Sequence, residues 1–440
     1  MSDLQIHYVP IDDLVPAARN ARTHSKKQIR QIAKSIEMFG FLNPVLCDGT
    51  RRIVAGHGRV DAAKLIAMAA VPVVYANDLT PDQLRLYAIA ENRLSELGGF
   101  STEILSLELS ELADLDLGCD LTITGFDTAE IDLMLSGPDH NDAADDLASA
   151  PPARAQPPMS QVGDLWQVGP HRIICGDARS MDTYAALLGD ERAQMIITDP
   201  PFNVRVADIS GLGKARHPEF EMASGEMSAE QFTGFLRAVI DQLVAFSANG
   251  SIHYLFMDYR HMGELLTAGS GAYAELKSLC VWVKSNAGMG SLYRSQHELV
   301  FVFKAGSAPH INNVQLGRFG RSRSNVWRYA GMNAFGRGRD EALALHATVK
   351  PVDLVSDAIL DCSERDGMIL DAFLGSGTTL VAAHRTGRRG YGIELDPYYV
   401  DAAVQRVSAA VGAPAVHVAS GRSFQAICAD RAALALGAAR

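Results

Sequence analysis

Residues 196–203 read Ile196-Ile197-Thr198-Asp199-Pro200-Pro201-Phe202-Asn203, an apolar run that ends in a carboxylate, two prolines and an aromatic ring. The apolar residues predict the end of a buried strand, and consecutive prolines stop it because they donate no ladder hydrogen bond. Asp199 is therefore expected at the carboxyl end of a strand, where open α/β sheets bind ligands. The octet predicts an α/β fold with a site at this edge of its sheet.

The same residues suit an exocyclic amino group on a nucleobase. Such an amine is a poor nucleophile because its lone pair is delocalised into the ring. Two acceptors, the Asp199 carboxylate and the Pro200 carbonyl, can each take one N–H and so localise the lone pair. Pro201 fixes the local backbone, and the Phe202 ring can hold a base extruded from the duplex. A strand followed by a proline-rich turn without any chemistry is the alternative.

Composition is that of a globular protein of two or three domains, with 440 residues and 48% hydrophobic content. The chain opens with no charged and apolar leader and holds no apolar run near about 18 residues, which predicts a cytoplasmic protein without a membrane anchor. Its 6 cysteines form no Cys-x-x-Cys pair, which argues against a metal site. The net charge of −11 is uneven, since no Lys or Arg occurs between Arg93 and Arg154, and basic patches elsewhere can still bind DNA.

Residues 1–95 predict a small α+β unit. Apolar residues recur at helical spacing between Ser25 and Phe39, and a strand at 53–55 runs into a glycine-rich turn before the next helix. Backbone amides at such a turn can hold phosphate, and an arginine there adds charge. The candidate nucleotide-binding residues of this turn are Gly56, His57, Gly58 and Arg59.

This unit resembles the ParB-like N-terminal domains. The elements that carry the resemblance are Gly40-Phe41-x-x-Pro44-Val45, Ile53-Val54-Ala55-Gly56-His57-Gly58-Arg59 and Glu91-Asn92-Arg93. In the partition proteins of that family the turn carries Glu-Arg-Arg and binds the phosphates of cytidine triphosphate, whereas this chain has His57-Gly58-Arg59. The resemblance implies the fold. A working nucleotide switch, or a domain that only positions DNA or a partner, are the two interpretations left open.

Residues 96–160 predict a connector. Leucines at helical spacing with neighbouring acids indicate a short amphipathic helix, and a second one ends near Leu135. From Gly137 the composition turns to Asp, Ala, Ser and Pro, which is typical of a solvated linker.

Residues 161–412 predict a second, larger unit in which strands and helices alternate. A stretch at 305–345 interrupts this pattern with Gly, Arg, Asn and aromatic residues, which suits phosphate contact and base reading; a plain surface loop is the alternative. The candidate DNA-binding residues in it are Arg318, Arg321, Arg323 and Arg328. Residues 413–440 form an alanine-rich tail.

A second site follows from glycines at a predicted strand-to-helix turn. Gly375 and Gly377 permit close approach of a ligand to the backbone, and Glu394 follows at the end of the next strand, which is the pattern that binds an adenosine. S-adenosylmethionine fits best, because the third glycine of a dinucleotide site and the Gly-Lys-Ser/Thr of a phosphate loop are both missing. Asp371 could accept from the amino group of this cofactor, and Asp177 from its adenine N6.

These residues closely resemble the DNA amino-methyltransferases of the beta arrangement. The matching elements are Gly176-Asp177, Asp199-Pro200-Pro201-Phe202-Asn203, Trp282-x-Lys284, His297-Glu298, His346-Ala347-Thr348-Val349-Lys350-Pro351, Phe373-Leu374-Gly375-Ser376-Gly377-Thr378-Thr379 and Glu394. The chain departs from the family in Phe202, where Tyr is common, and in Ala347, where Pro is common. The resemblance implies a seven-stranded Rossmann-like sheet and adds cofactor-binding residues, namely Ala178, Lys350, Phe373, Ser376 and Thr378.

The family carries out methyl transfer from S-adenosylmethionine to adenine N6 or cytosine N4, and its tendency favours adenine. No metal is required, because catalysis is largely proximity and orientation. Double-stranded DNA is the expected partner, while a homodimer and a cognate restriction nuclease are left open. Two other classes of function are a DNA-binding regulator with the methyltransferase half as scaffold and a ParB-like nucleotide switch.

Overall fold

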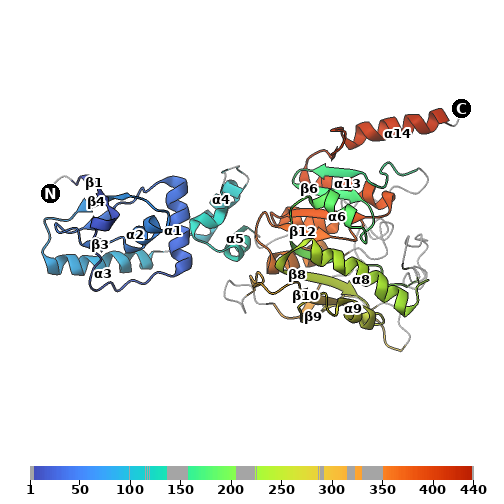
Figure 1. The fold of residues 1–440 in the computed structure, drawn as a ribbon, viewed down its shortest axis with the longest axis horizontal. Helices are drawn as coiled ribbons and strands as arrows, with labels where there is room; N and C mark the ends of the chain where they lie inside the picture. The colour runs from blue at the N-terminus through green and yellow to red at the C-terminus, as the bar shows by residue number, and fades with distance from the viewer. Residues whose placement is uncertain are drawn as a thin grey trace. The chain divides into compact units, whose positions relative to one another are not determined.

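The computed structural model describes residues 4–98, 100–113, 115, 117, 119–135, 157–204, 223, 225–285, 287, 292–314, 323–329 and 350–438. It divides into two compact units, Met1–Gly137 and Pro138–Arg440. Figure 1 shows the first in blue to cyan and the second in green to red. Across the described ranges, every helix is too short or too polar to cross a membrane.

The first unit is a four-stranded sheet with helices, in strand order β1-β4-β2-β3. Its strands are β1 (Ile6–Pro10), β2 (Val45–Cys47), β3 (Ile53–Ala55) and β4 (Ala70–Tyr75). Its helices are α1 (Lys26–Phe39), α2 (His57–Leu65) and α3 (Pro81–Leu97). The Ser25 side chain caps α1 by accepting from the Gln28 amide, and Gly40 ends the helix with a φ of 82°. The helix predicted from this spacing is therefore present.

The predicted connector begins with folded helices that belong to this first unit. They are α4 (Thr102–Ala113), the short 3-10 helix η2 (Leu121–Thr124) and α5 (Thr128–Leu135). Lys27 of α1 forms an ion pair with Asp127, and the Gln31 amide donates to the Gly125 carbonyl at 3.5 Å. These contacts fasten the helical segment to α1. Most of the predicted linker, residues 137–156, lies outside the described residues.

The second unit is built on one sheet of ten strands within the described residues, in the order β11-β9-β10-β8-β7-β12-β13-β6-β5-β14. The strands are β5 (Leu165–Val168), β6 (His171–Cys175), β7 (Ala193–Thr198), β8 (Ser247–Met257), β9 (Glu275–Val283), β10 (His297–Lys304), β11 (Val326–Arg328), β12 (Met368–Asp371), β13 (Arg389–Glu394) and β14 (Val416–His417). Strands β8, β7, β12, β13 and β6 run parallel to one another. The seven strands that the family resemblance implies are those from β9 to β6 in the sheet order given above. The sheet is wider than seven strands because β5 and β14 extend one edge and β11 extends the other.

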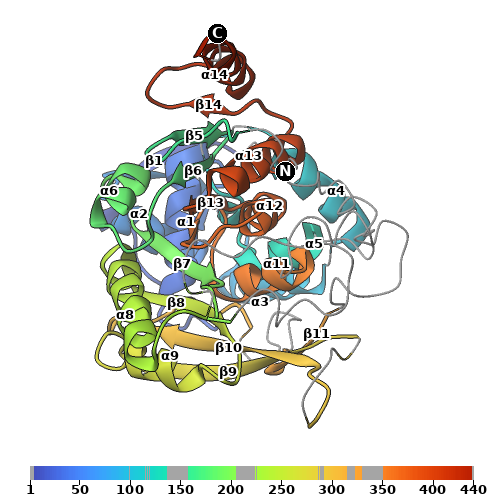
Figure 2. The same ribbon diagram turned by 90° about the vertical axis from the view of Figure 1, so that its right-hand side faces the viewer.

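Helices cover both faces of this sheet, as Figure 2 shows. They are α6 (Met181–Leu188), α8 (Ala229–Ala245) and α9 (Met262–Gly269) on one face, and α11 (Val352–Cys362), α12 (Thr378–Arg385) and α13 (Pro397–Val411) on the other. After β14 the chain ends in α14 (Phe424–Ala438). Parallel strands between two helical layers are buried on both faces. In β7, Ile197 belongs to one core cluster and Ile196 to the other.

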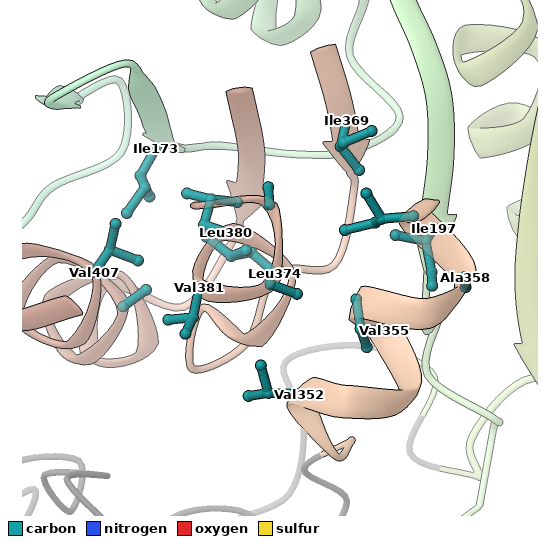
Figure 3. Close-up of a cluster of buried hydrophobic side chains, with 14 of the residues drawn as sticks. Ile173, Ile197, Val352, Val355, Ala358, Ile369, Leu374, Leu380, Val381 and Val407 are labelled. Carbon is teal, nitrogen blue, oxygen red and sulfur yellow. The ribbon is translucent and has the colours of Figure 1, made fainter. Parts of the chain in front are cut away.

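Figure 3 shows the first of these clusters, in which Val355 and Ala358 of α11 lie beside Ile197, and Leu380 of α12 lies beside Leu374. The packing against β13 is tight, because a Cβ atom on Gly392 would lie 2.6 Å from Leu374. The glycine therefore lets the turn after β12 lie directly on β13. This close approach positions the glycine-rich turn that Leu374 begins.

Candidate active site

The predicted site residues of the second unit gather at one edge of the sheet. Asp177 follows β6, Asp199 follows β7, Asp371 is the last residue of β12 and Glu394 is the last residue of β13. These four strands are parallel, so their carboxyl ends meet at the same edge. The structure thus brings together carboxylates that are separated by more than two hundred positions of sequence.

Asp199 carries one occupied and one open acceptor. The Lys350 ammonium donates to its Oδ2, whereas Oδ1 is buried and has no hydrogen-bond partner among the described residues. Burial raises the pKa of the Asp199 carboxyl, an effect that the Lys350 charge opposes and the nearby Glu298 charge reinforces. A buried acceptor without a donor costs free energy, on the order of 1–3 kcal/mol. Oδ1 is therefore poised to receive an N–H group from a ligand.

The chain after Asp199 is held in a turn by Asn203. This residue has a φ of 53°, a left-handed conformation that Asn tolerates better than most side chains. Its Oδ1 accepts from the amides of Gly225 and Met227, and its Nδ2 donates to the Met227 carbonyl at 2.9 Å. Pro200 is buried, while Pro201 and Phe202 are half-buried beside it. Sequence reasoning assigned Asn203 no role, although an Asn directly after the aromatic residue was the available signal.

The glycine-rich turn lies between β12 and α12. Gly375 and Gly377 have φ angles of 54° and 89°, and Gly377 is the N-cap of α12. A Cβ on Gly375 would meet nothing within 4 Å, so the backbone there is open to a ligand. A Cβ on Gly377 would lie 3.2 Å from Val407, so the second glycine is needed for packing against α13 as well. Both glycines therefore lie at the predicted strand-to-helix turn, and their contact with a cofactor stays a prediction.

Glu394 is oriented by backbone amides on both of its oxygens. Oε2 accepts from Gly375 at 2.8 Å and Oε1 accepts from Asp396 at 2.9 Å. Burial raises the pKa of the Glu394 carboxyl to about 7, against the effect of these two hydrogen bonds. The remaining lone pairs of a carboxylate fixed in this way can accept from a pair of vicinal hydroxyls, as the predicted ribose contact requires.

Asp371 is bonded within the protein. Its Oδ1 accepts from the Thr198 hydroxyl at 2.7 Å and the Phe373 amide at 3.0 Å, and its Oδ2 accepts from the Thr379 hydroxyl at 2.6 Å. The side chain therefore joins β7, β12 and α12. The structure shows this connecting role, and the cofactor contacts of Asp371 and Phe373 stay predictions.

Lys350 was predicted among the cofactor-binding residues, which stays a prediction; in the structure its ammonium contacts two carboxylates of the protein. It contacts Asp199 and lies 3.2 Å from Glu298, with a side chain that is only 7% exposed. Burial lowers the pKa of Lys350, but these two carboxylates outweigh that effect and raise it. The ammonium is thus bonded to the candidate catalytic carboxylate. The preceding motif residues, 346–349, lie outside the described residues.

The other predicted cofactor residues are also held by protein contacts. Asp177 binds the guanidinium of Arg179, with Nη2 and Oδ2 2.7 Å apart, and the Ala178 carbonyl accepts from a tyrosine hydroxyl. Ser376 and Thr378 both accept from Nη1 of Arg406, at 3.1 and 3.0 Å. Arg406 fixes the glycine-rich turn from α13, and sequence reasoning missed it because no local pattern connects residues so far apart.

The four predicted DNA-binding arginines fall into three cases. Arg318 and Arg321 lie outside the described residues. The Arg323 side chain is 17% exposed, donates to Asp357 at 2.6 Å and lies 2.8 Å from Asp361, so its charge serves to hold the start of β11 on α11. Arg328 is exposed at the end of β11. Phosphate contact therefore stays a prediction for Arg328, whereas the structure favours an internal role for Arg323.

This difference gives a testable expectation. Arg328→Ala should lower the slope of log K for duplex DNA against log salt by about one unit, because one phosphate contact is lost. Arg323→Ala is the matched control and should instead lower the melting temperature, because it removes the cation shared by Asp357 and Asp361. An unchanged salt slope for Arg328→Ala would remove β11 from the DNA interface.

Residues of the glycine-rich turn in the first unit contact other parts of the chain, and His57 also lines a cavity of about 300 Å³ together with His24 and Lys64. His57 Nε2 lies 3.3 Å from the Ala17 amide, and a Cβ on Gly58 would lie 2.9 Å from His24. The Arg59 guanidinium is turned inward, with Nη2 3.4 Å from the Pro44 carbonyl. Gly56 adopts a φ of 105° as the N-cap of α2. The fold matches the expected turn, while nucleotide binding by these four residues stays a prediction.

Comparison with known proteins matches three parts of the chain to known families. Residues 193–405 match the family described as DNA methylase, residues 1–93 the ParB N-terminal domain, and residues 103–162 the ParB-methyltransferase HTH domain. The ParB-like nuclease domain-containing protein YnaK of Escherichia coli (strain K12) is 50% identical over 80 residues, which are 18% of this chain and 92% of YnaK. The Type II methyltransferase M.ScaI of Streptomyces caespitosus is 36% identical over 96 residues, 22% of this chain and 32% of that protein. The crystal structure of the M1.HpyAVI-SAM complex aligns with 17% identity and a TM-score of 0.37 over 53% of this chain and 98% of that one.

Proposed function

We propose that this chain methylates the exocyclic amine of a base in double-stranded DNA. The chain belongs to the ParB N-terminal domain family through residues 1–93 and to the N6/N4 DNA methylase family through residues 193–405. The methylase family acts on adenine N6 or cytosine N4 and uses S-adenosylmethionine. For this chain we propose adenine N6 as the target, from the tendency of the family, with cytosine N4 as the second candidate.

The observation that carries the proposal is the open acceptor on Asp199. Its Oδ1 is buried without a partner among the described residues, in the turn where Pro200 and Phe202 follow. An amine that donates one N–H to Oδ1 and the other to the Pro200 carbonyl has its lone pair directed away from the base ring. The raised pKa of Asp199 also makes it a better acceptor for the proton that the nitrogen loses on methylation. The Phe202 ring offers a stacking surface for the extruded base.

The residues around the glycine-rich turn fit S-adenosylmethionine. The open backbone at Gly375 can approach the cofactor, and the carboxylate of Glu394 is fixed for hydrogen bonds to ribose hydroxyls. When bound, the cofactor supplies an electrophilic methyl group. Asp199 directly follows β7, and Glu394 is the last residue of β13. Only β12 lies between these two strands in the sheet. The protein's part is to hold the amine and the cofactor side by side.

The target base can be identified directly. The full chain would be incubated with duplex DNA and tritiated S-adenosylmethionine, and the DNA then digested to nucleosides and separated by mass spectrometry. N6-methyladenine is the expected product. N4-methylcytosine would establish the second candidate, and DNA without label in either nucleoside would overturn the proposed function.

The first unit is proposed to add DNA affinity or target choice. Lys26, Arg30 and Lys34 are exposed on α1, and their spacing places them on one face of that helix. A basic face of this kind suits phosphate contact. A nucleotide switch at Gly56–Arg59 is the alternative for this unit. A second copy of the chain and a cognate restriction nuclease are further proposed partners, and a DNA substrate supports a cytoplasmic location.

Glu394 gives the proposed cofactor site a pH dependence. Ribose hydroxyls donate to the ionised carboxylate, whereas burial raises its pKa to about 7 in the free protein. Binding is therefore expected to release protons below about pH 7, and the affinity should fall by up to about tenfold per pH unit as the pH is lowered. The contribution of Glu394 to the free energy of unfolding depends on pH in the opposite direction. The protonated carboxyl favours the folded state, so this stabilising contribution is lost as the pH rises from 4.5 to about 7.

Titration calorimetry in two buffers of different ionisation enthalpy measures this proton release. Glu394→Gln is the control, because its amide keeps the shape of the side chain and does not titrate. A wild-type affinity that is independent of pH from about 5.5 to 8, like that of the variant, would contradict a contact between Glu394 and the cofactor.

A further inference from the structure

A row of alternating charges leads from the candidate catalytic carboxylate toward the edge of the sheet. Lys350, which precedes α11, contacts Asp199 Oδ2 and lies 3.2 Å from Glu298 Oε2. Glu298 is the second residue of β10, and its Oε1 accepts from the ammonium of Lys284 at 2.5 Å. Lys284 directly follows β9, which pairs with β10. The row therefore joins four separate segments of the second unit.

The row is most buried in its middle and reaches solvent at its outer end. The side chains of Lys350 and Glu298 are 7% and 14% exposed, whereas those of Asp199 and Lys284 are 23% and 30% exposed. Two carboxylates and two ammonium groups balance in charge, which offsets the large cost of removing each ion from water. The proposed chemistry uses only Asp199 of these four residues. The motifs that contain Lys284 and Glu298 are without a role in it so far.

We propose that Glu298 is a positioning residue for methyl transfer, which holds the Lys350 ammonium on one oxygen of Asp199 and so keeps the other oxygen free for the target amine. This inference rests on the proposed function. An ammonium group has three N–H donors, and a carboxylate has two oxygens that can accept them. With Glu298 in place, the Lys350 ammonium has a second carboxylate oxygen 3.2 Å away, in an ion pair without hydrogen-bond geometry, and it contacts Asp199 through Oδ2. Without the attraction of that second carboxylate, the ammonium would turn toward Oδ1 and occupy the position of the amine.

Lys284 fixes Glu298 in the same way that Glu298 fixes Lys350. Its ammonium takes Oε1 and thereby leaves Oε2 directed toward Lys350. The Lys284 ammonium also lies 4.9 Å from the centroid of the Trp282 ring, an attractive position for a cation. The Trp282 indole in turn donates to the Tyr329 carbonyl at 3.1 Å, just after β11. Lys284 is therefore the outer positioning residue of the row.

Two variants and their combination test this arrangement in the full chain. Glu298→Gln should lower kcat roughly ten- to a hundredfold, since the amine loses part of its alignment, while the KM for S-adenosylmethionine changes less than about twofold. Lys284→Gln should have a smaller effect of the same kind. The double variant should lose less than the product of the two single losses, because both changes act on one chain of contacts.

The pH profile of kcat supplies a readout that a purely structural role would not move. The charged groups that act on Asp199 are Lys350, Glu298 and Asp371. Glu298→Gln removes one of the two negative neighbours, so the acid limb of the profile should move to lower pH even as the maximum falls. Glu275→Gln is the matched control, because Glu275 forms an exposed pair with Lys277 on the same strand β9, and it should leave kcat and the profile unchanged.

The outcomes separate this inference from the proposed function. A wild-type chain without methyl transfer would overturn the proposed function itself. An active wild type with unchanged kcat and an unchanged acid limb in Glu298→Gln would overturn only the positioning role. A variant that loses cofactor binding or its melting transition together with kcat would also overturn it, since Glu298 would then be needed for folding and not for alignment.

Discussion

Asp199→Asn is expected to lower methyl transfer at least about 10²-fold while changing cofactor affinity much less. The asparagine keeps the shape of the side chain and one acceptor, but it loses the charge that pairs with Lys350 and presents an N–H donor. Whichever way the amide turns, one of its two neighbours, Lys350 or the target amine, then meets a donor in place of an acceptor. The expected loss corresponds to about 3 kcal/mol, which is typical of removing one positioned polar group from an active site.

The measurement is tritiated methyl incorporation into duplex DNA, beside cofactor binding on the same preparation. Asp199→Ala should also fold, with a lowered melting temperature, because the Lys350 ammonium keeps Glu298 as its counter-charge. Asp241→Asn makes the same change in charge on α8, where Asp241 is exposed and pairs with Arg237, and it should keep wild-type turnover. Near-normal turnover in Asp199→Asn would move the catalytic centre away from this strand.

Gly377→Asp is expected to abolish measurable binding of S-adenosylmethionine, a loss of at least about 10²-fold. The residue has a φ of 89°, which strains any side chain with a Cβ, and that Cβ would lie 3.2 Å from Val407 and 3.3 Å from Ala403. The substitution would therefore displace the turn from α13, together with the Gly375 amide that orients Glu394. The proposed cofactor contacts depend on both.

Gly421→Asp is a suitable control for this experiment. Gly421 also has a positive φ, 67°, but it follows β14, and a Cβ there would meet nothing within 4 Å. The control should therefore carry the backbone strain without a steric clash, and calorimetry should show normal cofactor binding. If Gly377→Asp binds as tightly as this control, the cofactor does not use the glycine-rich turn.

Local patterns predicted the parts of the site that depend on the local chain. The end of β7, the turn after Asp199 and the glycine-rich turn between β12 and α12 are all present, because prolines and glycines act on the backbone next to them. The predicted alternation of strands and helices also gives parallel strands, whose carboxyl ends must share one edge. The gathering of Asp199 and Glu394 at that edge was therefore predictable from the sequence.

The contacts between distant segments were not predictable. Lys350 is 151 positions from Asp199, and nothing around it in sequence indicates a carboxylate as its partner. Arg323 lies in a basic stretch that suggested DNA, yet tertiary packing places it on two acids of α11. The contacts of Arg406 and Asp371 were equally unpredictable, because each side chain joins elements that meet only in the folded unit. Charge and composition predict which residues are polar, whereas the fold decides which of them pair with each other.

The burial of β7 on both faces determines how the site responds to opening of the protein. This strand lies between β8 and β12, and its alternate side chains enter the two separate core clusters. Its amide hydrogens can exchange with solvent only when both helical layers separate, so they belong to the slowest-exchanging class of the unit. Asp199 directly follows this strand, so its position depends on the same two core clusters. A destabilising substitution elsewhere in the second unit should therefore reduce the number of active molecules, while each molecule that remains folded keeps its full turnover.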